Sequence, residues 1–255
     1  MQVDLKDLQN HQLKMLQQLD VFLQQEGISY FAVHGTALGA VRHGGIIPWD
    51  DDIDLAMLRN DYEKFLSIAD KLPDNLFVIN NKENSNFPLL FSKVMDRNKD
   101  FEDKSLLRYD LPRKVFIDVF PWDNIEDPKN YKDLRKKVRR TVYKKFGGKL
   151  QTLKYYFNKV RYGFRNSTFF YEQLKEQLLK SQNKGIKTWG SVSEQGDFLV
   201  YEDIFPLRKV PFEDSYIYIP NNCEKYLVNK YGNNYMDIPA QEDRYNHSTL
   251  TKERL

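Results

Sequence analysis

The chain has 255 residues, 41% of them hydrophobic and 29% charged, so it can bury a substantial core and does not have the composition of a disordered chain. The formal net charge is only +3, and the single cysteine, Cys223, excludes an intramolecular disulfide and a cysteine metal cluster. No uninterrupted apolar run approaches the roughly 20 residues that a membrane-spanning helix needs, and the polar N-terminus lacks the apolar centre of a signal peptide. We therefore expect a cytoplasmic protein, either soluble or peripheral at the inner face of the membrane.

The first half of the chain predicts helices and strands in alternation. Leucines three and four residues apart predict an amphipathic helix over residues 5–25, which Gly27 ends. A later helix, over residues 59–72, has Asn60 as its expected N-cap. The other elements expected in this half are a short helix at 35–43 and strands at 28–33, 52–58, 76–80, 88–96 and 114–122.

The composition changes after Pro128. Residues 129–182 are basic and aromatic with helical spacing, interrupted by glycines at 147–148. Residues 196–220 return to a strand pattern, and a last helix is expected over 221–232. We therefore predict an α+β protein in three parts: a catalytic core (1–128), a basic aromatic helical insertion (129–197) and a C-terminal part that returns to the core (198–255).

Four aspartates, Asp50, Asp51, Asp52 and Asp54, stand together in the stretch VHGTALGAVRHGGIIPWDDDIDLAM (33–57). Alternate residues of an extended chain share a face. Asp50, Asp52 and Asp54 are therefore expected on one face, with Asp51 in a loop or facing outward. Such crowding raises the pKa of each carboxyl unless a cation is present. The apolar flanks argue against a solvated acidic loop, and an EF-hand calcium loop requires glycine where leucine stands here. A hard divalent ion, Mg²⁺ or Mn²⁺ in its place, is the better explanation.

Two further features indicate phosphoryl transfer. Gly35 and Thr36 join a predicted strand to a short helix, and unpaired N–H groups at a helix N-terminus bind phosphate. Asp118 lies in the otherwise apolar strand KVFIDVFPW, where an unpaired aspartate is costly. It is either a third metal-binding carboxylate or a structural aspartate paired with a backbone N–H or an arginine.

The order Gly-Thr, Asp-x-Asp and then a third Asp on another strand resembles the nucleotidyltransferase superfold of the polymerase-β type. More narrowly, HGTALGAVRHGGIIPWDDDIDLAM (34–57) is similar to the signature of the LicD family of phosphocholine transferases, which also includes the fukutin-related proteins. FIDVFPWD (116–123) resembles the second motif of that family, and VPFEDSYIYIPNNCEKYLVNKYGNNYM (210–236) resembles its C-terminal element. The resemblance covers roughly residues 15–125 and 200–250 and leaves the helical insertion unmatched.

The resemblance implies roles for single residues. The implied metal ligands are Asp52, Asp54 and Asp118, which are also the expected catalytic residues. Asp50 would be either a further metal ligand or a carboxylate that supports the ligands from outside. Gly35 and Thr36 would face the phosphates of a CDP-linked donor, and Trp49 is a further expected substrate contact.

Four other polar residues have two interpretations each. Arg42 either holds a phosphate as a fork or pairs with an aspartate. Lys93 is a lone cation in an apolar strand and needs an anion, either a phosphate or an aspartate. His247 is either a substrate contact or part of a polar tail, and His34 is either catalytic or a hydrogen-bonded structural group.

The activity that the resemblance implies is metal-dependent transfer of phosphocholine from CDP-choline to a hydroxyl of a cell-surface glycan, with release of CMP. The acceptor would be a teichoic acid or lipo-oligosaccharide precursor. Alternatives are another CDP-alcohol donor such as CDP-ribitol, nucleotidyl or glycosyl transfer from a nucleotide donor, and a non-catalytic protein that binds phosphocholine or a glycan. Aromatic faces hold quaternary ammonium ions, but the sequence assigns no particular aromatic residues to choline.

The insertion carries an uneven charge. Between Lys129 and Arg165, 14 lysines and arginines stand against one acid, Asp133, which leaves +13 there and, from the total of +3, about −10 elsewhere. The interleaved aromatic residues are Tyr131, Tyr143, Phe146, Tyr155, Tyr156, Phe157, Tyr162 and Phe164. This composition suits an anionic membrane surface, and the alternative is a solvated helix face with core aromatics. Nucleic acid is not an expected partner, because no recognised binding motif accompanies the charge.

Overall fold

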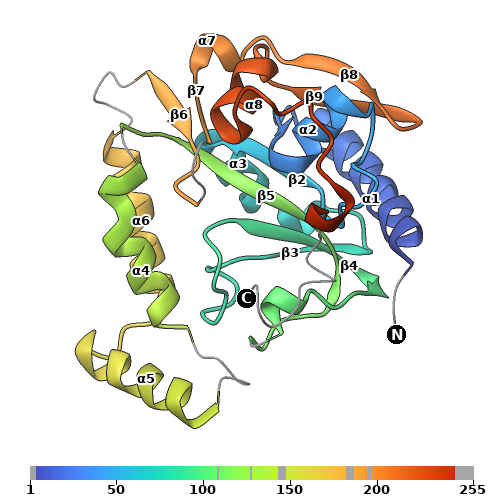
Figure 1. Cartoon of the computed structure of the whole chain (residues 1–255). Helices are drawn as coiled ribbons and strands as arrows, with labels where there is room; N and C mark the ends of the chain where they lie inside the picture. The colour runs from blue at the N-terminus through green and yellow to red at the C-terminus, as the bar shows by residue number, and fades with distance from the viewer. Residues whose placement is uncertain are drawn as a thin grey trace.

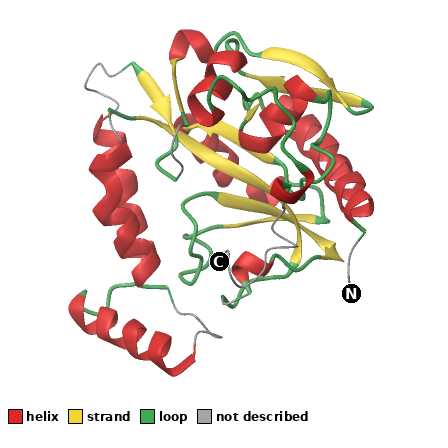
Figure 2. Ribbon diagram, in the orientation of Figure 1, coloured by secondary structure: helices red, strands yellow, loops and turns green. Residues whose placement is uncertain are grey.

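The structure is a computed structural model that describes residues 4–107, 109–126, 128–142, 148–181, 187–193 and 197–244. Helices pack around one mixed sheet (Figures 1 and 2), which confirms the α+β class. Within the described ranges, no helix is both long and apolar enough to cross a membrane. His247, which is a predicted substrate contact, lies outside the described residues.

The sheet brings strands from distant parts of the chain together. Its order is β1-β2-β5-β4-β3, and β6 and β7 extend it from the end of β5. β2 and β5 are parallel, and the other neighbouring pairs of this sheet are antiparallel. A separate antiparallel hairpin of β8 and β9 contacts β1. The strands are β1 (Phe31–Ala32), β2 (Asp54–Leu58), β3 (Leu76–Ile79), β4 (Ser92–Asp100), β5 (Lys114–Asn124), β6 (Thr188–Gly190), β7 (Phe198–Val200), β8 (Arg208–Phe212) and β9 (Ser215–Ile219).

The helices cover this sheet and extend beyond one end of it (Figure 1). The helix α1 packs along β5, α3 packs on β2 and β5, and α2 contacts α8. Their bounds are α1 (Leu5–Gln25), α2 (His34–Arg42), α3 (Arg59–Ser67), α4 (Lys132–Arg140), α5 (Gly148–Arg161), α6 (Ser167–Ser181), α7 (Tyr201–Ile204) and α8 (Cys223–Tyr231).

Three local expectations were wrong in detail. The helix predicted over residues 59–72 ends at Ser67 and is followed by a separate 3₁₀ turn, Ala69–Lys71. Its N-cap is Leu58 rather than Asn60, because β2 runs directly into α3 and leaves no intervening residue for a side-chain cap. The strand expected at 28–33 is paired only over β1.

The helix α1 fixes the aspartate loop through two buried glutamines. Gln9 Nε2 donates to the backbone carbonyl of Asp50 at 2.8 Å. Gln12 Nε2 donates to the carbonyls of Asp51 at 2.9 Å and of Phe116, on β5, at 3.2 Å. Since buried amides and carbonyls are costly without partners, these bonds tie the loop to both the helix and the sheet.

The helical insertion forms a second apolar cluster beside the main core. The helices α4 and α6 pack against each other, and α6 also contacts β5. Tyr131 and Tyr162, two of the predicted membrane-facing aromatics, contribute to this cluster instead. Tyr143 and Phe146 lie outside the described residues.

Candidate active site

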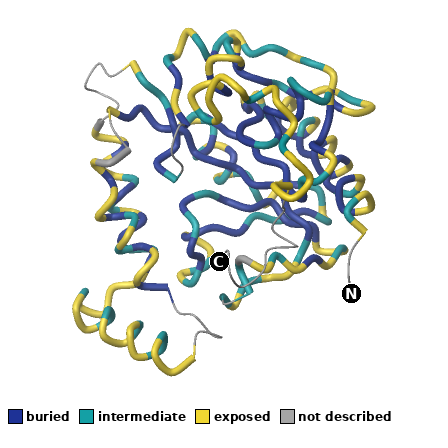
Figure 3. The backbone as a smooth tube through the Cα atoms, in the orientation of Figure 1, coloured by how far each residue is buried: buried dark blue, intermediate teal, exposed yellow. Residues whose placement is uncertain are grey.

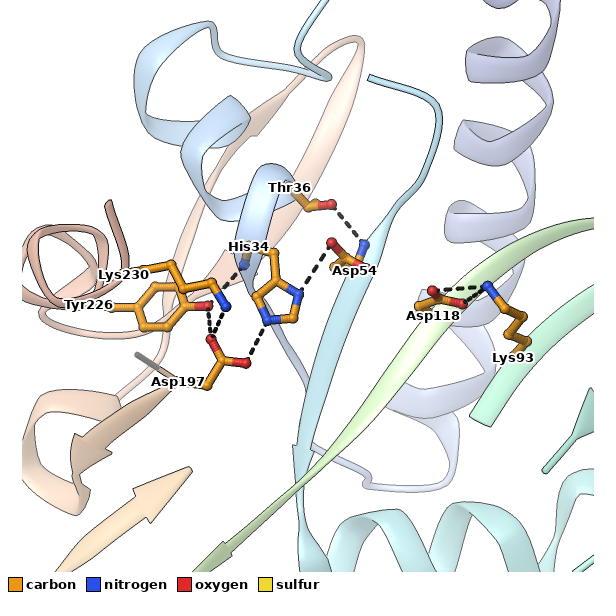
Figure 4. Close-up of polar contacts among 8 residues, drawn as sticks. All are labelled: His34, Thr36, Asp54, Lys93, Asp118, Asp197, Tyr226 and Lys230. Carbon is orange, nitrogen blue, oxygen red and sulfur yellow. Dashed lines mark hydrogen bonds and ion pairs between the residues drawn. The ribbon is translucent and has the colours of Figure 1, made fainter. Parts of the chain in front are cut away.

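Three neighbouring strands place polar groups in one row across the sheet (Figure 4). In the parallel pair, Asp54 on β2 is in register with Asp118 on β5. In the antiparallel pair, Asp118 is in register with Lys93 on β4. Residues in register on adjacent strands lie side by side on the same face, so the pairing alone brings these residues together.

The carboxylates that the sequence singles out gather at this row. One oxygen from each of Asp52, Asp54 and Asp118 lies within 4.8 Å of the other two, and all three residues are buried. A second group with the same spacing consists of Asp50, Asp51 and Asp52. Asp51 lies in a loop, which confirms one of the two expectations for it, but it is only 1% exposed, so the other expectation, that it faces outward, was wrong. The reason is that α1 draws this part of the loop inward through its bond to Gln12.

Lys93 forms an ion pair with Asp118. Its ammonium donates to Oδ1 at 2.7 Å and to Oδ2 at 3.0 Å, and both residues are buried. The net pKa of Asp118 is raised to about 7. Burial is the largest cause, Lys93 opposes it, and the neighbouring Asp54 carboxylate adds to it. Of the two anions expected for Lys93, the structure therefore places an aspartate beside it.

The start of α2 packs closely against the aspartate loop. The backbone N–H of Asp54 donates to Thr36 Oγ1 at 2.8 Å, so Thr36 holds the first residue of β2. A Cβ atom on residue 35 would lie 2.3 Å from Asp50 Oδ2. Gly35 therefore makes room for the Asp50 carboxylate. The pKa of Asp50 is raised well above its usual value, first by burial and then by the neighbouring Asp52 carboxylate.

The close approach of residues 35 and 50 gives a testable coupling. In an unobstructed helix, Gly→Ala stabilises by about 1 kcal/mol. In the wild-type background, we expect Gly35→Ala to give no such stabilisation, because the new Cβ forces Asp50 to move. In the Asp50→Ala background, the same substitution should stabilise the protein by about 1 kcal/mol. A double-mutant cycle from urea unfolding should give a coupling free energy of about 1 kcal/mol or more. Additive effects of the two substitutions would show that the Cβ meets no obstruction.

His34 lies at the centre of a second polar network (Figure 4). Its Nδ1 is 3.3 Å from Asp54 Oδ2, and its Nε2 is 2.5 Å from Asp197 Oδ2. The hydroxyl of Tyr226 accepts from the His34 backbone N–H and donates to Asp197 Oδ1, each at 3.0 Å. The ammonium of Lys230 lies 3.1 Å from the same Asp197 oxygen.

This network holds His34 as a cation in an uncommon backbone conformation. Burial lowers the pKa of His34, but the carboxylates of Asp197 and then Asp54 outweigh that effect and raise it to about 10. Burial alone would raise the pKa of Asp197, and the His34 cation keeps it below its usual value. The φ angle of His34 is 48°, in the left-handed region that costs energy in residues with a Cβ. The surrounding hydrogen bonds hold it there.

Sequence reasoning did not find Asp197, Tyr226 or Lys230. Tyr226 and Lys230 lie in the predicted last helix, four residues apart and therefore on one face, which is the only local signal. Asp197 immediately precedes the short apolar strand β7, and nothing near it in the sequence points to residue 34.

Two predicted substrate contacts lie apart from the aspartate row. Arg42 Nη1 donates to the backbone carbonyls of Tyr235 and Asp237, each at 3.0 Å, which is neither of the partners expected for it. Trp49 packs between cations, with the guanidinium of Arg42 5.9 Å and that of Arg244 4.5 Å from its ring centre. Their contact with substrate stays a prediction.

The row of Asp54, Asp118 and Lys93 lies in a cleft of about 470 Å³. Acidic, basic and aromatic side chains line this cleft. The residues Phe116, Asp118 and Phe120 alternate along β5 and share one face, which turns two rings toward the acidic group. Phe91, just before β4, lies 4.1 Å from Phe120 between ring centres. The other charged or titratable residues that line the cleft are His34, Asp52, Asp54, Lys93, Asp103, Lys230 and Tyr231.

The donor set suits a hard divalent cation. Carboxylate oxygens are the ligands that Mg²⁺ prefers, and Asp52, Asp54 and Asp118 present three of them at close range. The pKa of Asp118 is raised because burial and the neighbouring carboxylates disfavour its charged form. A bound cation would stabilise that charged form.

Part of the chain, which includes the clustered aspartates, is similar to a known family of proteins. Residues 27–129 match the model described as LicD/FKTN/FKRP, nucleotidyltransferase domain. The lipopolysaccharide cholinephosphotransferase LicD of Haemophilus influenzae is 28% identical over 257 aligned residues, which cover 94% of this chain and 95% of that protein. The human ribitol 5-phosphate transferase FKRP is 49% identical over 39 residues, which cover 15% of this chain and 8% of that protein.

Proposed function

We propose that this protein is a metal-dependent phosphotransferase of the LicD family that moves phosphocholine from CDP-choline to a hydroxyl of a glycan; the match of residues 27–129 to the model of that family supports this assignment. The observation that carries the proposal is the row of Asp54 and Asp118 on parallel strands, with Asp52 beside them. Phosphoryl transfer needs positioning and charge stabilisation above all, and a carboxylate-bound cation supplies both. Related proteins named for phosphocholine and ribitol phosphate transfer support this class.

We assign the following roles to residues of the cleft. Asp52, Asp54 and Asp118, with Asp50 beside them, would hold Mg²⁺ or Mn²⁺. When bound, this ion neutralises the charge of the donor phosphates and polarises the transferred group. Gly35 and Thr36 keep the carboxylate loop close to the start of α2, where donor phosphates would face backbone N–H groups.

The reaction that follows is a single displacement at phosphorus. The oxygen of the acceptor hydroxyl attacks the phosphorus that bears choline, the bond from that phosphorus to the oxygen of CMP breaks, and CMP leaves. The hydroxyl proton passes to Asp118, which the strand pairing holds beside Asp54. Lys93 beside Asp118 supplies a positive charge close to the transferred group.

The aromatic wall favours choline over ribitol as the alcohol of the donor. Quaternary ammonium ions bind the faces of aromatic rings, whereas ribitol offers hydroxyls that need hydrogen-bond partners. Phe91, Phe116 and Phe120 line the cleft beside the carboxylates. We also assign the core of the protein to the nucleotidyltransferase superfold of the polymerase-β type. The three parts proposed from the sequence, 1–128, 129–197 and 198–255, would then be a catalytic core, an insertion that ends at Asp197 and a returning segment that supplies Tyr226 and Lys230.

The product released distinguishes this function from its rivals. The protein is incubated with CDP-choline, Mg²⁺ and a glycan acceptor, either a teichoic acid or a lipo-oligosaccharide precursor. We expect CMP and a phosphocholine-bearing glycan, and we expect EDTA to abolish both and excess Mg²⁺ to restore them. Parallel reactions contain CDP-ribitol, a nucleoside triphosphate or a nucleotide sugar.

Each alternative predicts a different result. Faster CMP release from CDP-ribitol would reassign the donor. Pyrophosphate release from a nucleoside triphosphate would indicate nucleotidyl transfer, and release of a nucleoside diphosphate from a nucleotide sugar would indicate glycosyl transfer. Binding of phosphocholine without turnover or metal dependence would indicate a binding protein.

A further inference from the structure

The helix α5 presents an apolar stripe to solvent. Leu150, Leu153, Phe157 and Val160 follow one another at intervals of three and four residues, which places them on one face of the helix. They are between 63% and 68% exposed, and none of the residues of α5 is buried. Figure 3 shows the helix exposed along its length, beyond the end of α4 and α6. Apolar residues on one stripe of an exposed helix indicate a partner surface.

The orientation of α5 makes this exposure notable. Its polar face is the one turned toward the protein, because Asn158 Nδ2 donates to the backbone carbonyl of Arg140 at the end of α4, at 3.3 Å. Gln151 and Thr152, on the polar side, are half-buried. The helix therefore packs with its apolar stripe outward, although a second apolar cluster lies nearby in α4 and α6.

The charge around the stripe is strongly positive. The helix α5 contains Lys149, Lys154, Lys159 and Arg161 and no acidic residue. The exposed cations of α4 lie on the same part of the molecule; they are Lys132, Lys136, Arg139 and Arg140. Because the rest of the chain is net negative, the positive charge is concentrated where the apolar stripe is exposed.

We propose that α5 lies in the plane of an anionic lipid bilayer, with its apolar stripe at the boundary between headgroups and acyl chains. An in-plane amphipathic helix has an apolar face for this boundary and lysines and arginines for anionic headgroups. A second copy of the chain fits less well, because pairing two α5 helices would bring eight like charges together. A soluble polyanion accounts for the cations but not for the stripe. The inference does not depend on the transferase activity.

Vesicle flotation tests the proposal with the full-length protein. Vesicles of phosphatidylcholine alone are compared with vesicles that contain phosphatidylglycerol in equal amount. We expect partitioning to the anionic vesicles to be at least about tenfold stronger and to weaken as salt is raised. Val160→Asp and Phe157→Asp should each reduce it by about tenfold or more, since each removes an apolar group and adds a negative charge.

A matched control separates the stripe from a general effect of added charge. Val21, on α1, is 55% exposed, and Val160 is 68% exposed. Val21→Asp therefore makes the same chemical change at an exposed position of another helix, and it should leave partitioning unchanged. Circular dichroism of each variant checks that the fold is retained.

Three results would overturn the proposal. The first is an absence of binding to anionic vesicles at low salt. The second is binding that survives both stripe substitutions, which would indicate a purely electrostatic attraction to polyanions. The third is a dimer of the wild-type protein, seen by light scattering, that Val160→Asp dissociates, which would make a second copy the occupant of the stripe.

Discussion

Asp54→Asn is expected to abolish phosphocholine transfer while the protein stays folded. Asp54 begins β2, is in register with Asp118, and provides one of the three clustered carboxylates. Asparagine has nearly the same shape but no negative charge, so the site loses attraction for a divalent cation. We expect kcat to fall by about 10³-fold or more, as when a group that stabilises transition-state charge is removed. The backbone bond from residue 54 to Thr36 is unaffected, so β2 keeps its position.

The control for this experiment is Asp96→Asn. Asp96 is also a buried aspartate, on β4, but it pairs with His11 and Asn75 away from the cleft. We expect its substitution to change stability and to leave kcat within about twofold. Mn²⁺ titration by calorimetry should show weakened binding in Asp54→Asn only. Near-normal turnover of Asp54→Asn in Mg²⁺ would disprove the metal-site assignment, whereas lost turnover with unchanged Mn²⁺ affinity would disprove only the role of Asp54 as a ligand.

The largest loss of stability is expected for Arg59→Met. Arg59 begins α3, and its guanidinium holds Asp123 on β5 through two bonds of 2.7 Å. Arg59 is 2% exposed and Asp123 is fully buried. Removal of the cation leaves a carboxylate buried without its partner, which costs about 3–5 kcal/mol in the free energy of unfolding. Urea unfolding followed by circular dichroism measures this cost.

A double variant tests the cause of that loss. Arg59→Met with Asp123→Leu removes both charges, and buried ion pairs replaced by apolar residues often lose little stability. We expect the double variant to recover most of the stability that the single variant loses. A single variant that loses less than about 1 kcal/mol, or a double variant no more stable than the single one, would contradict this account of the ion pair.

The parts of the site that could be predicted from the sequence are those with local signals. Asp52 and Asp54 stand in a dense motif between apolar residues, and Asp118 is conspicuous because its strand is otherwise apolar. Alternation along an extended chain was enough to expect Asp52 and Asp54 on a common face. The structure brings them together, and it adds the strand register that explains how.

The parts that could not be predicted depend on contacts between distant segments. Asp197 reaches His34 across 163 positions of sequence, and no pattern near either residue announces the other. Gln9 and Gln12 lie on the buried face of α1. From the sequence alone, a glutamine near that face could equally be exposed at the surface, so their bonds to the aspartate loop could not be predicted. Arg42 had two reasonable partners, a phosphate or an aspartate, and the structure gives it the carbonyls of a segment nearly 200 residues away.

The same long-range contacts bear on whether the site can be separated from the rest of the chain. The family match spans residues 27–129, but the supports for its carboxylates lie on both sides of that span. The glutamines of α1 come before it, and Asp197 and Tyr226 come after it. A fragment cut at the limits of the match would keep the aspartates and lose the groups that orient them. The smallest unit that preserves the geometry of the cleft therefore extends at least from Gln9 to Lys230, beyond both limits of the match to the family model.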